Sequence, residues 1–215
     1  MKVGTDGVLL GAWFSMQAGC RVLDIGTGTG LIAILAAQRG ASRVTAVEID
    51  PDAAGQARAN AARSCWADRI EVVCADIARF NDDSGFDRIV CNPPYFRDSL
   101  RSPDAGRNTA RHNDTLSFET LSACASRLLA DDGRFSLVLP WDSVGTFSRC
   151  AAANGLDMCR RTDVVTVTGK SPKRALVEFG RCCPKLENDT LEICGPDGKE
   201  TSEYVNLVKD FYLKY

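Results

Sequence analysis

Four residues near the middle of the chain, Asn92-Pro93-Pro94-Tyr95, end an apolar run abruptly. The amide of Asn92 offers a hydrogen-bond acceptor, and the ring of Tyr95 offers a face on which a flat molecule can stack. The prolines fix their own φ angles and so hold the carbonyl of Pro93 in place as a second acceptor. An exocyclic amine that donates both of its hydrogens to these acceptors can aim its lone pair at an electrophile. The motif predicts chemistry on the amine of a flat ring, driven by orientation without a covalent enzyme intermediate.

A glycine-rich turn, written Asp24-Ile25-Gly26-Thr27-Gly28-Thr29-Gly30, follows the first apolar run of the chain. Glycines let the main chain turn sharply and approach a ligand closely, so Gly26, Gly28 and Gly30 are candidates for ligand binding. Their spacing is G-x-G-x-G and differs from the G-x-G-x-x-G of dinucleotide-binding folds. No Walker lysine follows them. Hydride transfer and nucleotide hydrolysis are therefore both disfavoured.

Acidic residues close the next two apolar runs, at Glu48-Ile49 and at Asp76-Ile77. A carboxylate at Glu48 can accept both hydroxyls of a ribose, and one at Asp76 can accept from the exocyclic amine of an adenine. Either acid alone is as readily a helix cap or a solvated loop residue. In this order, three successive strand ends predict a nucleoside-shaped pocket. Beside a motif that activates an amine, such a pocket implies S-adenosylmethionine as the methyl donor, with S-adenosylhomocysteine as its product.

The elements that must position these residues alternate between strands and helices. Strands are predicted over 20–26, 42–50, 69–76, 86–92 and 133–140, and helices over 29–40, 51–64, 117–133 and 142–155. Such alternation is typical of a parallel sheet covered on both faces. After residue 140 the rhythm changes, and two strands, 163–169 and 174–181, are joined by a short turn. We expect a doubly wound α/β fold with an antiparallel hairpin appended.

The composition of the chain limits its domain number, its possible metal sites and its relation to membranes. A chain of 215 residues with 45% hydrophobic and 25% charged residues is expected to form one domain. The ten cysteines include no C-x-x-C pair and the only histidine is His112, so a zinc site is not expected and most thiols should pack as small apolar residues. The cysteine count alone leaves an oxidising compartment open as the alternative. No signal-peptide pattern and no long apolar run occurs, so we expect a cytoplasmic enzyme without a membrane span.

Basic residues gather in one tract although the net charge of the chain is −2. Six Lys or Arg lie between Arg160 and Arg181 against two acids, and Lys170, Lys173 and Arg174 fall at the predicted hairpin turn. Such a tract can contact nucleic-acid phosphates, or it can be a solvated hairpin. Arg111, in the long segment after the proline motif, is a further candidate for RNA contact.

The motifs LDIGTGTG, VEID, CAD and NPPY, in that order, resemble class I S-adenosylmethionine-dependent methyltransferases of the amino-methylating branch. The flanking motifs are more specific. MKVGTDGVLLGAW, ARHNDTLSFETL, KSPKRALVEF and the terminal DFYLKY are similar to those of the bacterial tRNA1(Val) (adenine(37)-N6)-methyltransferase family. Together these motifs span nearly the whole chain.

The resemblance implies a Rossmann-like, seven-stranded, mostly parallel sheet, with tRNA as the partner and an anticodon-loop adenosine as the target. It also implies that residues 1–215 form one methyltransferase domain that lacks a short N-terminal segment, and that no metal takes part. The catalytic motif comprises Asn92, Pro93, Pro94 and Tyr95. The cofactor-binding positions are Asp24, Gly26, Gly28, Gly30, Glu48, Ile49, Asp76, Ile77 and Asn92.

Three other functions remain open from the residues. Methylation of a protein glutamine amide also uses NPPY-type motifs, but the N-terminal helical domain of those enzymes has no counterpart here. Methylation of adenine in DNA would require room for a target-recognition domain. A non-catalytic RNA-binding protein with this fold would have no need of intact glycines, acids and NPPY.

Overall fold

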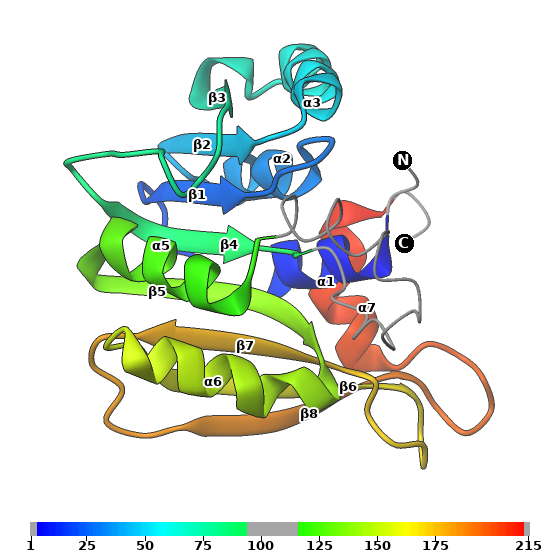
Figure 1. The fold of residues 1–215 in the computed structure, drawn as a ribbon. Coiled ribbons are helices and arrows are strands. Elements are labelled where there is room, and N and C mark those ends of the chain that lie inside the picture. Colours follow the sequence, from blue (N-terminus) through cyan, green and yellow to red (C-terminus); the bar gives the residue numbers. More distant parts are fainter. Residues whose placement is uncertain (1–3, 94–115, 213–215) are drawn as a thin grey trace, which may run out of the picture.

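A sheet of eight strands runs through the part of the chain that the computed structural model describes, residues 4–93 and 116–212 (Figure 1). Its order is β3-β2-β1-β4-β5-β7-β6-β8. The strands are β1 (Arg21–Ile25), β2 (Arg43–Glu48), β3 (Ile70–Cys74), β4 (Phe86–Cys91), β5 (Leu129–Pro140), β6 (Asp157–Val167), β7 (Arg174–Gly180) and β8 (Glu187–Cys194). Neighbours among β1–β5 pair in parallel, and β7 pairs antiparallel with both β5 and β6. The predicted α/β fold and its antiparallel hairpin are thereby confirmed.

The order in which strands are added to the sheet reverses at β1. From β1 the chain proceeds outwards through β2 to β3, and it then returns to place β4 and β5 on the other side of β1. In open α/β sheets a ligand binds at the carboxyl ends of the strands, where the strand order reverses. The topology therefore points to the loops after β1 and β4.

Six α-helices lie among the described residues. They are α1 (Thr5–Trp13), α2 (Leu31–Gln38), α3 (Pro51–Arg63), α5 (Phe118–Leu128), α6 (Val144–Ala153) and α7 (Ser202–Val208). Local sequence explains where α3 and α5 begin. Asp50 accepts hydrogen bonds from the N–H groups of Asp52 and Ala53 ahead of Pro51, and Ser117 accepts from that of Thr120. These are helix starts that the sequence marks clearly.

Two apolar layers, one on each face of the sheet, hold the fold together. Helices α1, α2 and α7 cover one face, and α5 and α6 cover the other (Figure 1). Strands β1 and β4 are buried at nearly every position, as parallel strands covered on both faces must be. The sheet is therefore a rigid frame for the loops at its carboxyl edge.

The structure differs from the expected seven-stranded sheet by one strand. Strand β8 pairs in parallel with β6 at the end of the sheet, and its first four residues are exposed. An edge strand so rich in polar residues carries little of the apolar signal that marks a buried strand. The helices α1 and α7 also had no clear sequence signal, because α1 is apolar all round and α7 is only seven residues long.

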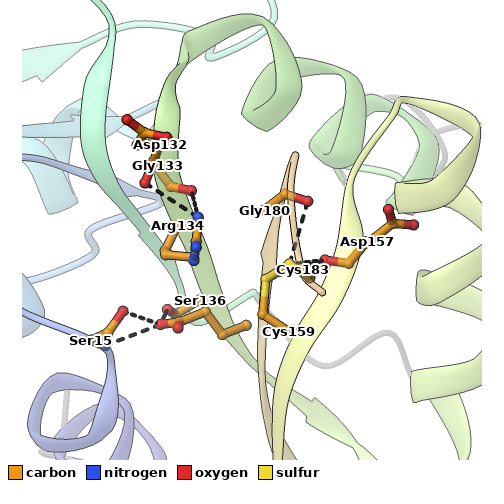
Figure 2. The surroundings of a disulfide bond; sticks show 10 residues. Ser15, Asp132, Gly133, Arg134, Ser136, Asp157, Cys159, Gly180 and Cys183 are labelled. Atoms are coloured by element: carbon orange, nitrogen blue, oxygen red, sulfur yellow. Dashed lines mark hydrogen bonds between the residues drawn. A yellow bond between two sulfur atoms is a disulfide. The ribbon is translucent and has the colours of Figure 1, made fainter. Parts of the chain in front are cut away.

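The cysteines do not follow the expectation that most of them pack as small apolar residues. Only Cys20, Cys91 and Cys124 are buried among the free thiols. Cys159 on β6 and Cys183, three residues after β7, are joined by a disulfide (Figure 2). This bond ties the first turn of chain after β7 to the beginning of β6, a pairing that counting cysteines could not predict.

Candidate active site

The predicted site residues meet at the carboxyl edge of the sheet. Ile25, the last residue of β1, is level with Val47 on one side and with Cys91 on the other. The following residues, Gly26, Glu48 and Asn92, therefore lie side by side, with Gly26 in the middle. Because neighbouring strands are about 4.8 Å apart, the Cα atoms of Glu48 and Asn92 are separated by about 10 Å.

The acidic and amide side chains also share one face of the sheet. Val90 packs in the apolar layer beneath α1 and α2, and Cys91 packs in the opposite layer. Side chains alternate along a strand, so Asn92 points to the same face as Val90. The same alternation from Ala46 and Val22 directs Glu48 and Asp24 to that face. The three polar side chains thus lie on one side of the carboxyl edge of the sheet.

The glycine loop is held to the end of β2 by main-chain hydrogen bonds. The N–H groups of Gly26 and Thr27 both donate to the carbonyl of Val47, at 2.9 and 3.1 Å. Gly26 and Gly28 have φ angles of 66° and 57°, in the left-handed region that favours glycine. A side chain at Gly26 would meet no atom within 4 Å, so this stretch of main chain faces open space. Gly30 precedes α2 and packs against Ala57 of α3.

Asp24 is buried beneath this loop, with 1% of its surface exposed. Its Oδ2 accepts hydrogen bonds from Thr27 Oγ1 at 2.5 Å and from the N–H of Ala33 at 3.1 Å. Its Oδ1 is buried and has no partner among the described residues. Burial away from water raises the pKa of Asp24 to about 7, and the negative charge of Glu48 adds to the increase. Asp24 therefore orders the loop through Oδ2, while its Oδ1 has no hydrogen-bond partner among the described residues.

Glu48 links the two loops that border the pocket. Its Oε2 accepts from the N–H of Gly28 at 2.8 Å, and its Oε1 accepts from the N–H of Asp50 at 3.0 Å. A carboxylate oxygen has two lone pairs, so each can accept a further bond from a diol. Ile49 follows with 62% of its surface exposed, a large apolar side chain open to a flat ligand.

The third predicted acid lies beyond the end of β3. Asp76 Oδ1 accepts from the N–H of Ala78 at 2.9 Å, while Oδ2 is 4.0 Å from Arg79 Nε on the solvent side. Asp76 is 41% exposed, so it retains the capacity to accept from an adenine amine. The side chain of Ile77 is buried in the apolar layer, which leaves its main chain as the part that can border a ligand.

Asn92 and Pro93 follow β4 directly, Asn92 half-buried and Pro93 buried. No hydrogen bond to the amide of Asn92 occurs within residues 4–93 and 116–212, so both its oxygen and its nitrogen can serve a substrate. A side chain at Gly7 of α1 would come within 3.7 Å of Asn92 Nδ2. Helix α1 therefore forms a wall of the site. Pro94 and Tyr95 lie outside the described residues.

The four cations predicted to contact RNA are in different situations. Arg174, at the start of β7, forms an ion pair with Asp6 of α1, with 2.7 Å between Nε and Oδ2. Its charge is therefore already compensated within the fold. Lys170 and Lys173 are exposed in the turn between β6 and β7 and have no acidic partner among the described residues. Arg111 lies outside the described residues.

Known proteins resemble this chain over its whole length. Residues 3–140 match the family model of the methyltransferase small domain. The tRNA1(Val) (adenine(37)-N6)-methyltransferase of Bacteroides fragilis is 47% identical over 100% of this chain and 92% of its own length. The chain belongs to the tRNA1(Val) (adenine(37)-N6)-methyltransferase family. The resemblance inferred from its motifs is confirmed.

Solved structures agree with the family at the level of the fold. A protein described as a predicted O-methyltransferase from Agrobacterium tumefaciens superposes with a TM-score of 0.74, at 22% identity over 95% of this chain and 96% of that one. A glycopeptide N-methyltransferase solved with S-adenosylmethionine gives a TM-score of 0.61, at 16% identity over 82% and 95% of the two chains. The tRNA1(Val) (adenine(37)-N6)-methyltransferase family thus shares the Rossmann-like methyltransferase fold.

The edge described above fits S-adenosylmethionine, the methyl donor of this family. The open main chain at Gly26 leaves room for a ligand, and Ile49 offers an apolar surface to a flat ring. The oxygen Oδ1 of Asp24 and the spare lone pairs of Glu48 favour a ligand that brings donors and positive charge. In residues 4–93 and 116–212 no cluster of side chains could hold a metal ion, and no helix is long and apolar enough to cross a membrane.

Proposed function

We propose that this chain transfers a methyl group from S-adenosylmethionine to N6 of adenosine 37 in tRNA1(Val). The observation that carries the proposal is the position of Asn92. Its amide, which has no hydrogen bond within the described residues, follows β4 directly beside Gly26, on the same face of the sheet as Glu48. An acceptor for the amine of a base thus lies next to the strand ends that we propose to bind the nucleoside of the cofactor. Relatives across the family carry this activity in their names.

Each side chain at the edge has a separate task. Glu48 accepts from the ribose hydroxyls, Asp76 accepts from the adenine amine, and Ile49 with the main chain of Ile77 borders the adenine ring. Asp24 holds the glycine loop, in which Gly26, Gly28 and Gly30 allow close approach of the main chain. When bound, S-adenosylmethionine supplies an electrophilic methyl group on its sulfonium.

The target base is oriented by the motif after β4. Asn92 Oδ1 and the carbonyl of Pro93 accept the two hydrogens of N6, so that the lone pair on nitrogen points towards the donor. Pro94 and Tyr95 lie outside the described residues, and we assign them the roles that their side chains suit, a fixed φ angle and an aromatic face for the base. The protein contributes orientation and fixed dipoles, and no covalent bond to the enzyme forms.

An anticodon-loop adenosine suits such a site because it is already partly unpaired. Removing a loop base from its stack requires less free energy than flipping a base out of a duplex. We expect Lys170 and Lys173 to contribute phosphate contacts at the same edge of the sheet. Residues 1–215 would act as one domain, since one sheet runs from β3 to β8. With tRNA as its substrate, we expect the enzyme to act in the cytoplasm.

The test is nucleoside analysis by mass spectrometry. Unmodified tRNA1(Val) transcript is incubated with the protein and S-adenosylmethionine, digested, and analysed for N6-methyladenosine, with a transcript carrying guanosine at position 37 as the control. Methylation of the first transcript alone supports the proposal. A methyl group that instead appears on a protein glutamine or in duplex DNA would contradict it.

A further inference from the structure

A tryptophan at the carboxyl edge of the sheet is both exposed and fixed in orientation. Trp141 follows β5 directly and has 43% of its surface exposed. Its Nε1 donates to Asp163 Oδ2 at 3.0 Å, and the guanidinium carbon of Arg161 lies 5.5 Å from the ring centroid. Arg161 in turn donates to Asp163 Oδ1 at 2.7 Å. Two neighbours on β6 thus hold one face and the edge of the indole.

This ring lies on the same edge of the sheet as Asn92. Strands β4 and β5 are parallel, and Cys91 is level with Leu137, so Asn92 is level with Val138. Trp141 is three residues further along, which places the two Cα atoms about 11 Å apart. The N–H of Trp141 also donates to the carbonyl of Lys173 at 3.1 Å. Along the sheet edge the tryptophan therefore lies between the catalytic motif and the basic turn of the β6–β7 hairpin. Its indole is held by Asp163 on the face opposite to that of Asn92, because Val164, the neighbour of Asp163, packs in the layer beneath α1.

The chemistry around the ring favours a nucleobase as its ligand. A large aromatic side chain held in one orientation, yet open to solvent, presents a ready face for stacking, and every base has a π-face to match it. The carboxylate of Asp163 at the ring edge disfavours a phosphate at that point. Lys170 and Lys173, which have no acidic partner among the described residues, belong to the adjacent turn and suit the phosphate backbone.

We propose that Trp141 is a stacking platform for an unpaired base of the tRNA, a few nucleotides from the methylated adenosine. This inference rests on the proposed function, because it takes the substrate to be RNA with an unpaired loop. Trp141 would hold the RNA in register while Asn92 acts on the target. Its contribution is to RNA affinity and leaves the binding of S-adenosylmethionine untouched.

The experiment combines affinity with intrinsic fluorescence, since a base stacked on an indole quenches its emission. The chain has three tryptophans, of which Trp13 is buried and Trp66 lies just before β3. Unmodified tRNA1(Val) transcript is titrated into the wild type, Trp141→Phe, Trp141→Ala and the control Trp66→Phe. We expect quenching in the wild type and in Trp66→Phe, and its loss in Trp141→Phe. The Kd of Trp141→Ala for RNA should rise roughly 5- to 150-fold, while Trp141→Phe keeps most of the affinity.

The outcomes separate this inference from the function on which it rests. Normal RNA affinity of Trp141→Ala, or quenching that persists in Trp141→Phe, overturns the platform even when the transcript is methylated. A wild type that neither binds nor methylates the transcript overturns both. Affinity for S-adenosylhomocysteine, measured by calorimetry, shows that each variant is folded. If Trp141→Ala does not fold, the quenching comparison between the two phenylalanine variants still decides.

Discussion

The carboxylate of Glu48 accepts the N–H of Gly28, with 2.8 Å between Oε2 and the nitrogen. Its second oxygen accepts the N–H of Asp50 at 3.0 Å. One side chain at the end of β2 therefore joins the glycine loop after β1 to the loop after its own strand. The two segments proposed to bind the nucleoside of the cofactor are therefore joined by one side chain.

The first prediction follows from this connection by Glu48. Glu48→Ala should weaken binding of S-adenosylmethionine by about 1–3 kcal/mol, since the diol and two N–H groups lose their acceptor together. Calorimetric titration measures the change. Asp52→Ala, an exposed acid in the first turn of α3, is the matched control and should bind as the wild type does. Equal affinity of Glu48→Ala and the wild type would remove Glu48 from the ribose site.

The second prediction concerns Asn92. Asn92→Ala should lower kcat by at least about 100-fold, the effect of removing one preorganised transition-state partner, with little change in affinity for S-adenosylmethionine. Asn92→Asp keeps an acceptor oxygen and should retain part of the activity. Single-turnover methylation of tRNA under saturating conditions isolates the chemical step. A variant that methylates at the wild-type rate would show that the amine is activated by other groups.

The third prediction uses the pKa of Asp24, which burial raises to about 7. Between about pH 4 and pH 7 the folded protein holds a proton on Asp24 that the unfolded chain has released. The contribution of Asp24 to the free energy of unfolding therefore falls as pH rises, by at most about 1.4 kcal/mol per pH unit, and becomes constant above about pH 7. Asp24→Asn removes this dependence. The unfolding free energy of Asp24→Asn, relative to that of the wild type, should therefore increase between pH 5 and pH 8.

Urea unfolding of both proteins at pH 5, 6.5 and 8 measures the difference. The amide introduced by Asp24→Asn is close in shape to the carboxylate and can still accept from Thr27 and Ala33, so the comparison isolates the charge. Parallel pH profiles of the two proteins would mean that the Asp24 carboxyl titrates outside this range.

The fourth prediction separates the cations of the hairpin. Lys170→Ala combined with Lys173→Ala should reduce the slope of log K for tRNA against log salt by about 1.5, because each phosphate contact contributes about 0.7–0.9. Lys185→Ala, at the opposite edge of the sheet, is the control and should keep the wild-type slope. An unchanged slope in the double variant would make this turn a solvated hairpin.

Arg174→Ala is expected to behave differently from the two lysine variants. Removing Arg174 leaves Asp6, whose side chain is 13% exposed, without its ionic partner. The main effect should be a lower Tm, since the ion pair joins α1 to β7. Loss of tRNA affinity at unchanged Tm would show instead that Arg174 contacts RNA.

Much of the fold and the site could be predicted because its signals are local. Apolar runs of strand length, the cap at Asp50 and the turn glycines each act within a few residues of chain, where geometry follows from residue type. The rule that ligands bind at carboxyl strand ends then brings Gly26, Glu48 and Asn92 together without further information. These local signals predicted the α/β fold and the edge that holds the site, whereas the family was inferred from the resemblance of motifs such as NPPY and ARHNDTLSFETL to known methyltransferases.

Only the tertiary structure decided what lies between distant parts of the chain. The pair of Asp6 and Arg174 spans 168 residues, so nothing nearby in the sequence indicates that Arg174 is already neutralised. The wall that α1 builds beside Asn92 and the locked but exposed ring of Trp141 likewise depend on packing between elements. The burial that raises the pKa of Asp24 is the sum of every neighbour that excludes water, a quantity that residue types and spacing do not contain.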